Sequence, residues 1–332
     1  MDPQPGPPSG LNGPAVSFIL GRYLSLLLND WATIVDKNIE INTVSAHKTI
    51  DIKRLRADLI LLLVALIWGT AFVAQRLGAE QSGIFVFNGL RFLIATLVLL
   101  PFIRFHWKVE RKLLPLVLLT GLLLFAGSAF QQAGLQFTTA GNAGFITTLY
   151  VVLVPILLLL FWRQQVSWLA WAAAILAVAG GWLLSTSGTF QVAPGDGLEL
   201  VGSLLWAFHV ILIGKLAGRM QPLQLALSQS FVAGVLSLVA GLFFETHTIA
   251  QVAGSWLPIL YLGIVSTAVA FTLQIVGQRH SPATDAAIIM SMEAVFAAIS
   301  GYILLGEILH TVQIIGCAMI FAAILMAQAR RT

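Results

Sequence analysis

The sequence predicts an all-α membrane protein in which ten transmembrane helices form two inverted five-helix repeats around a central cavity. Three observations lead to this prediction: the composition, the spacing of apolar runs, and a likeness between the two halves. Of the 332 residues, 58% are hydrophobic and only 10% are charged, and the mean hydropathy is +0.91. A soluble domain normally carries about 25% charged residues. Lipid must therefore be the solvent for most of this chain.

Apolar runs alternate with short polar breaks from Asp58 onward. Each run has about 20 residues, the length that crosses a bilayer as a helix. Because the breaks are short, consecutive helices are expected to be antiparallel. The expected spans are 58–77, 84–104, 113–132, 141–162, 167–186, 198–216, 223–244, 256–276, 284–305 and 311–329.

Residues 1–56 differ from the rest and are expected to form a cytoplasmic tail that is partly disordered. Met1–Pro14 is rich in Pro and Gly, a composition typical of disorder. The apolar stretch Ala15–Leu28 contains Arg22 and is too short to span a membrane. Its spacing suits an amphipathic helix at the membrane interface, and a dispensable extension is the alternative.

Basic residues cluster at every second connection, before the first span (Lys53, Arg54) and after the tenth (Arg330, Arg331). Connections on the other side carry mainly acids and histidines. The positive-inside rule then places both termini in the cytoplasm, with the chain in the inner (plasma) membrane. This placement explains the net charge of +4 without a nucleic-acid partner.

The two halves resemble each other, which divides the spans into a repeat over 57–188 and another over 189–332. The first span contains L-I-W at Leu66–Trp68, and the sixth contains L-L-W at Leu204–Trp206. Since five is an odd number, the second copy is expected to be upside down in the bilayer. Inverted repeats are typical of transporters whose binding site lies near the midplane.

Three longer motifs carry a family resemblance: W-G-T-A-F-V-A-Q at Trp68–Gln75, G-N-A-G-F-I-T-T-L-Y-V-V-L-V-P at Gly141–Pro155, and M-E-A-V-F-A-A-I-S-G-Y-I-L-L-G-E at Met292–Glu307. In this order and spacing, the sequence resembles the EamA family of the drug/metabolite transporter superfamily. The resemblance implies a ten-helix basket with a central cavity that moves amino acids, related metabolites or drugs, commonly outward. It does not name one substrate.

Two titratable side chains lie near the middle of expected spans. A charge at the position of Glu293 costs roughly 2.5–3.5 kcal/mol on insertion scales, so this carboxyl is a candidate for proton coupling or for binding a substrate amine. A structural carboxyl bonded to a neighbouring helix is the alternative. His209 titrates in a range suited to a proton relay, or it is a hydrogen-bonded packing residue. Whether Glu293 and His209 pair cannot be read from the sequence.

Further candidates for substrate binding lie in other spans. Arg91, just after Asn88, could attract a substrate carboxylate from the outer side, or it could anchor its helix by snorkelling or ion pairing. Aromatic walls with a few polar groups suit small amphipathic molecules, and packing is the alternative for each residue. The remaining candidates are Trp68, Tyr150, Trp206, Phe145 and Gln274.

The sequence contains no G-x-x-x-x-G-K-[ST] motif for ATP, so energy is expected from a gradient, with protons as one candidate ion. The single cysteine, Cys317, lies in an apolar run, and no metal or cofactor is expected. We therefore predict a secondary transporter rather than an enzyme, exporting amino acids or related small metabolites or drugs by alternating access. Its partners are a small-molecule substrate and the lipid bilayer, and a homodimer is left open. The competing hypothesis is an integral membrane enzyme or flippase acting on lipid-linked substrates.

Overall fold

The structure, a computed structural model, describes residues 52–79, 83–103, 109–186, 193–246, 249–306 and 308–329. Every regular element in these ranges is a helix. Ten helical stretches there are long and apolar enough to cross a membrane. The all-α class and the ten predicted spans are therefore confirmed. The expected tail lies, up to residue 51, outside the described residues.

The first five spans come from the first half of the chain. They are α2 (Ile52–Ala79), α3 (Ile84–Leu99) with the turn η1 (Leu100–Phe102), η2 (Arg111–Leu113) with α4 (Leu114–Gly134), α5 (Ala140–Thr148) with α6 (Tyr150–Trp162), and α7 (Trp168–Thr186).

The second half supplies the other five spans and one short helix, α10 (Ile249–Gly254). The spans are α8 (Asp196–Leu216), α9 (Pro222–Phe244), α11 (Trp256–Tyr261) with η3 (Leu262–Val269) and α12 (Ala270–Gln278), α13 (Ala283–Met290) with α14 (Met292–Leu305), and α15 (Thr311–Ala329).

Three spans depart from the α-helix in their interior, besides the 3₁₀ turns at the end of the second span and the beginning of the third. The fourth is interrupted at Leu149 and the ninth at Ser291, where i→i+3 bonds tighten the backbone: Val152 N donates to Leu149 O, and Ala294 N donates to Ser291 O. In the eighth span, η3 is a π-helical stretch, a wide turn often found at functional sites. All three irregularities lie in the interior of their spans.

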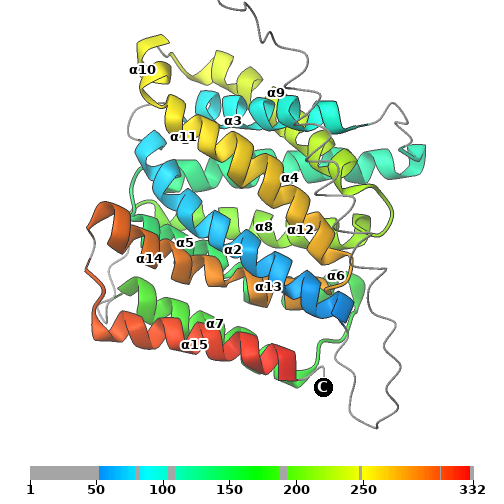
Figure 1. Cartoon of the computed structure of the whole chain (residues 1–332), viewed down its shortest axis with the longest axis vertical. Coiled ribbons are helices and arrows are strands. Elements are labelled where there is room, and N and C mark those ends of the chain that lie inside the picture. The colour runs from blue at the N-terminus through cyan, green and yellow to red at the C-terminus, as the bar shows by residue number, and fades with distance from the viewer. Residues whose placement is uncertain are drawn as a thin grey trace, which may run out of the picture. The chain divides into compact units, whose positions relative to one another are not determined.

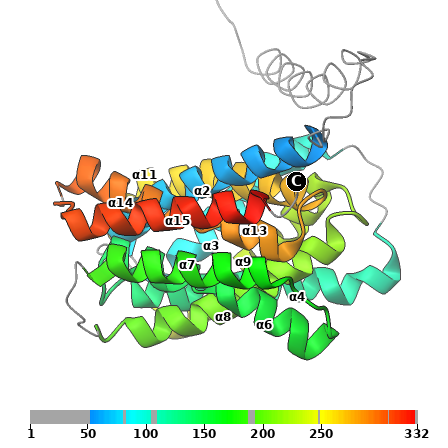
Figure 2. The same ribbon diagram turned by 90° about the horizontal axis from the view of Figure 1, so that it is seen from below.

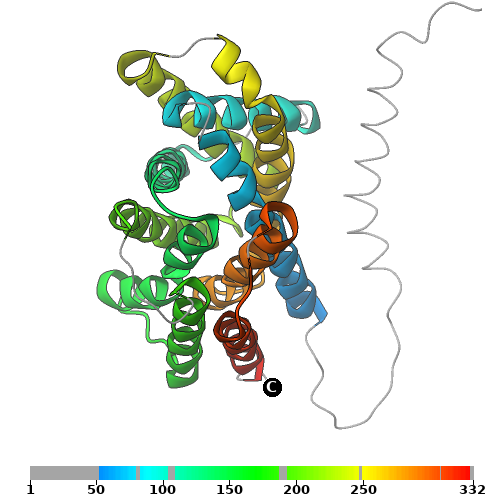
Figure 3. The same cartoon turned by 90° about the vertical axis from the view of Figure 1, so that its left-hand side faces the viewer.

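The ten spans run roughly along one direction, horizontal in Figure 1 and viewed nearly end-on in Figure 3. Because their number is even, the first and last described residues, Ile52 and Ala329, lie on one face of the bundle, which we call the terminal face. The opposite face is the distal face. The beginning of α2 and the end of α15 both lie at the right of Figure 1.

Helix partners follow the same pattern in both halves. The first span, α2, packs against α12 and α14, and its counterpart α8 packs against α4, α5 and α6. Equivalent helices also pair directly: α3 with α9, and α7 with α15. Figures 1 and 2 both show α7 and α15 side by side.

Two glycines allow α7 and α15 to approach closely. A Cβ atom on Gly180 would lie 2.6 Å from the carbonyl oxygen of Gly316, and a Cβ on Gly316 would lie 2.4 Å from that of Gly180. Small residues at such contacts are the usual means by which membrane helices pack. This helix pair is thus held by backbone contact.

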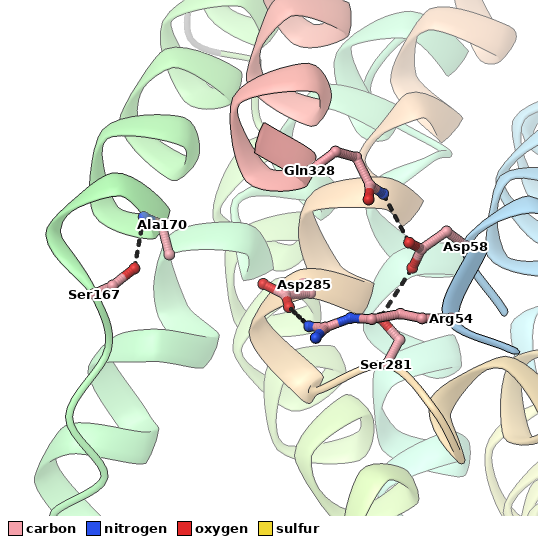
Figure 4. A network of polar contacts seen from close by, with 7 residues as sticks. All are labelled: Arg54, Asp58, Ser167, Ala170, Ser281, Asp285 and Gln328. Atoms are coloured by element: carbon pink, nitrogen blue, oxygen red, sulfur yellow. Dashed lines mark hydrogen bonds and ion pairs between the residues drawn. The ribbon is translucent and has the colours of Figure 1, made fainter. Parts of the chain in front are cut away.

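A polar network joins three helices at the terminal face (Figure 4). Arg54 Nη2 of α2 lies 2.7 Å from Asp285 Oδ2 of α13. The Asp58 carboxylate accepts hydrogen bonds from Ser281 Oγ at 3.3 Å and from Gln328 Nε2 at 2.9 Å. Both acids are buried, so the network fixes the beginning of α2 against α13 and the end of α15.

Candidate functional site

A central cavity lies where the two halves of the chain meet. It contains about 540 Å³ of empty space, counting the part that is open to solvent. The first half lines it with residues of α2, α3, α4, α5 and α6, and the second with residues of α8, η3, α12 and α14. A molecule in this cavity would therefore contact both halves at once.

An aromatic cluster forms one wall of the cavity. The Trp68 and Phe271 ring centroids are 5.0 Å apart, and Trp206 stacks on Phe271 at 6.2 Å. Trp68 Nε1 donates to the carbonyl oxygen of Ser266, 3.1 Å away, within the π-helical stretch. His209 packs edge-on against Trp206 and Phe271. Trp68 and Trp206 are the equivalent residues of the two repeats, and both pack against the Phe271 ring.

The breaks in the fourth and ninth spans each precede a polar residue of the cavity. Tyr150 is the first residue of α6, and Glu293 is the second residue of α14. The Tyr150 hydroxyl lies near enough to the Glu293 carboxyl to interact with it. Within the described residues, neither Tyr150 OH nor Glu293 Oε1 has a hydrogen-bond partner of ordinary geometry. The Glu293 side chain, 3% exposed, therefore keeps one carboxyl oxygen without a hydrogen-bond partner in the described residues.

A buried arginine lines the cavity from α3. Arg91 Nη1 donates to Gln75 Oε1 at 3.1 Å, and its guanidinium carbon lies 4.8 Å from the centre of the Phe92 ring. Arg91 Nε has no hydrogen-bond partner in the described part of the chain. One helical turn earlier, Asn88 Nδ2 donates to the carbonyl oxygen of Ser128. Asn88 thus joins α3 to α4, whereas Arg91 offers donors to the cavity.

The structure gathers six of the nine predicted site residues around this cavity: Trp68, Arg91, Tyr150, Trp206, Gln274 and Glu293. Gln274 is fully buried, and both polar atoms of its amide lack partners among the described residues. Asn88, Phe145 and His209 do not line the cavity. His209 lies behind the aromatic wall, with Nε2 2.8 Å from Gln229 Oε1. The roles of all nine residues stay predictions.

Sequence reasoning missed a chain of polar residues that leads away from the cavity towards the distal face. Gln131 Nε2 donates to Thr147 Oγ1 at 3.1 Å, and Thr147 Oγ1 donates to Glu199 Oε2 at 3.3 Å. Gln131 and Thr147 line the cavity, and Glu199 is fully buried. The first two could have been noticed as polar residues inside apolar runs. Glu199 could not, because an acid in the first turn of a helix is ordinary.

The side chains of the cavity can bind small molecules that carry charged groups and an apolar part. The Glu293 carboxyl can accept hydrogen bonds from an ammonium group, and the Arg91 guanidinium can donate to a carboxylate. The aromatic wall offers apolar contact between them. In the described ranges, no group of three or more His, Cys, Asp or Glu side chains could hold a metal ion.

Comparison with known proteins agrees with this architecture. The model of the EamA-like transporter family matches twice, over residues 55–186 and 193–328. A protein of Archaeoglobus fulgidus, named an uncharacterized transporter, is 36% identical over 284 residues, which cover 84% of this chain and 88% of the relative. YedA of Escherichia coli K12, named an uncharacterized inner membrane transporter, is 26% identical over 281 residues, which cover 80% of this chain and 88% of YedA.

A solved crystal structure shares the fold, with a TM-score of 0.70 at 20% sequence identity, covering 83% of this chain and 98% of the other. The ten apolar spans and the named relatives support a multi-pass inner-membrane protein with a transport function. Because the family model covers both halves of the described bundle, the chain belongs to the EamA-like transporter family, with one family repeat in each half.

Proposed function

We propose that this protein is a secondary transporter that exports amino acids or related small metabolites or drugs across the inner membrane. The two halves would lie in opposite orientations and alternate the access of the central cavity between the two sides. The observation that carries this proposal is the cavity itself, which residues from both repeats line. The distribution of basic residues favours a cytoplasmic terminal face.

The pairing of charges in the cavity supports a zwitterionic substrate. Glu293 and Arg91 are both buried and line the same cavity. A buried charge without a partner is costly, so a substrate that brings an ammonium and a carboxylate would satisfy both groups. Trp68, Trp206 and Phe271 would then contact its apolar part. Amino acids combine these features.

We further propose that Glu293 couples transport to protons or binds the substrate amine. Its carboxyl has an unpartnered oxygen, and no cationic side chain is bonded to it in the described residues. A group that alternates between a proton and a substrate ammonium would link the two fluxes. This role requires an ionisable carboxyl, which an amide of the same shape cannot replace.

The experiment is counterflow of labelled amino acids in proteoliposomes. We expect uptake by the wild type and a loss of at least roughly tenfold in Glu293→Gln, since removing a charged hydrogen-bond partner costs about 1.5–3 kcal/mol. The matched control is Glu110→Gln, which makes the same change at an exposed carboxyl paired with Lys112.

Wild-type counterflow by a well-expressed Glu293→Gln protein would show that the carboxyl is not used. If no amino acid, metabolite or drug of the panel exchanged, the transporter proposal would give way to the hypothesis of lipid-linked substrates.

A further inference from the structure

A second pocket lies at the terminal face and shares no lining residue with the central cavity. It contains about 750 Å³ of empty space, counting the part open to solvent, and lies between the ends of α6, α8 and α12 and the beginning of α13. Lys215 is next to the last residue of α8, and Gln278 is the last residue of α12. Since these positions end membrane spans, the pocket lies at the depth of the lipid headgroups.

The ionisable side chains that line this pocket are all of basic type: Lys215, Arg279 and His280. Arg279 is held in place, because its Nε donates to the carbonyl oxygen of Ala217 at 2.8 Å and its Nη2 to that of Met220 at 2.6 Å. Lys215 extends over the Trp162 ring, with Nζ 3.4 Å from the ring centre. Two cations of restricted position thus face a pocket whose lining includes no carboxylate.

The beginning of α13 adds a further attraction for anions, because the acid of its first turn, Asp285, is paired with Arg54. Pro282 precedes the helix and provides no side-chain cap, and the first backbone bond runs from Ala286 N to Pro282 O. The N–H groups of the first turn therefore have no acceptor within the helix. Pro282 and Ala283 line the pocket, and uncapped helix N-termini are favourable sites for phosphate groups.

A buried amide in the pocket sets a second requirement for any ligand, besides negative charge. Gln278 is 4% exposed and lines the pocket. Its Nε2 donates to the carbonyl oxygen of Val210 at 3.0 Å, whereas its Oε1 has no partner in the described residues. An oxygen of this kind accepts a hydrogen bond. A matching ligand therefore carries an N–H or O–H donor beside its anionic group.

We propose that this pocket binds a phospholipid headgroup in which the phosphate diester carries a hydroxyl or ammonium donor, as in phosphatidylglycerol or phosphatidylethanolamine. The phosphate contacts Lys215, Arg279 and the beginning of α13, and the donor reaches Gln278 Oε1. The adjoining end of α6 exposes Leu160 (68%) and Phe161 (64%), which offer an apolar surface to the acyl chains. Basic pockets between membrane helices are known to bind anionic headgroups.

The test is native mass spectrometry of the delipidated protein in detergent with phosphatidylethanolamine, phosphatidylglycerol, phosphatidylcholine or inorganic phosphate. Phosphatidylethanolamine and phosphatidylcholine have the same zero net charge, but only phosphatidylethanolamine carries a hydrogen-bond donor. We expect phosphatidylethanolamine to be retained at least several-fold better than phosphatidylcholine, and inorganic phosphate not to displace either phosphatidylethanolamine or phosphatidylglycerol. Lys215→Gln removes one cation and should lower phosphatidylglycerol retention several-fold, whereas Lys112→Gln, at an exposed side chain, should not.

A second variant fills the pocket without changing its charge. A Cβ on Gly214 would lie 3.4 Å from Gln278 Nε2 and 3.6 Å from the Ala283 Cβ, so Gly214→Leu places bulk against the Gln278 amide and should also lower retention. Equal retention by Lys215→Gln and the wild type would overturn the proposal. So would equal retention of phosphatidylethanolamine and phosphatidylcholine, and displacement by inorganic phosphate would assign the site to a free anion instead of a lipid.

Discussion

The contact between α2 and α14 depends on Gly69. A Cβ at this position would lie 2.4 Å from the Phe296 Cβ and 2.8 Å from the carbonyl oxygen of Glu293. Non-bonded carbons rest at about 3.5–4.0 Å. In Gly69→Ala, the two helices would therefore have to separate by about 1 Å, and the carboxyl of Glu293 would move with α14.

Overpacking of this kind typically costs about 1–3 kcal/mol. At roughly 2–4 °C for each kcal/mol, the melting temperature of the purified protein should fall by roughly 2–12 °C. Alanine also has the better helix propensity, by about 1 kcal/mol, and this gain opposes the loss. The comparison must therefore be made with another Gly→Ala change in a helix.

Gly141→Ala provides that control, because a Cβ on Gly141, in the first turn of α5, would meet nothing within 4 Å. Intrinsic fluorescence during heating, in one detergent, measures both variants and the wild type. We expect Gly69→Ala to melt well below Gly141→Ala and to lose counterflow. Equal melting temperatures for the two variants would refute the reasoning that α2 and α14 touch through their backbones.

Three further predictions concern other contacts. Asp285→Asn should lower stability by roughly 1–3 kcal/mol, because it breaks the 2.7 Å ion pair of a buried carboxylate with a partly exposed Arg54. In chemical denaturation, Arg54→Gln should cost more, because it takes the cation away from a buried carboxylate, and the double variant should recover part of that loss. Thr147→Val removes the hydrogen bond to buried Glu199 and should cost about 1–3 kcal/mol, whereas Thr147→Ser should melt like the wild type. Trp68→Phe keeps an aromatic ring next to Phe271 but loses the bond to Ser266 O, so half-saturation in counterflow should shift by about the fivefold that 1 kcal/mol represents; an unchanged value would show that this bond does not position the wall.

Much of the fold could be predicted because bilayer thickness fixes the length of each apolar run, whatever the run packs against. The breaks at Leu149 and Ser291 could not. Neither position is a glycine or a proline, the usual markers of an interrupted helix, and both lie in interior segments. Such local tightening of the backbone depends on how neighbouring helices pack, and this packing cannot be predicted from hydropathy.

The site was predictable where membrane burial makes a residue costly. That cost singled out Glu293 and Arg91, and both line the cavity. Phe271 gave no indication, since an apolar residue in an apolar run is unremarkable in sequence. Glu199 is buried because Gly134 makes room for it: a Cβ on Gly134 would lie 2.7 Å from the Glu199 Cγ. A space created by a glycine on another helix is visible only in three dimensions.

The π-helical stretch η3 has a consequence for the relation between the repeats. Its counterpart in the first half, α4, is an uninterrupted α-helix. Within the described residues, only the second repeat therefore presents a widened turn whose carbonyl, at Ser266, accepts a hydrogen bond from an indole of the other half. The two repeats therefore contribute different groups to the cavity. A small molecule in the cavity meets different groups from the two repeats, so the cavity can bind it with different affinities when it opens to one side of the membrane or to the other.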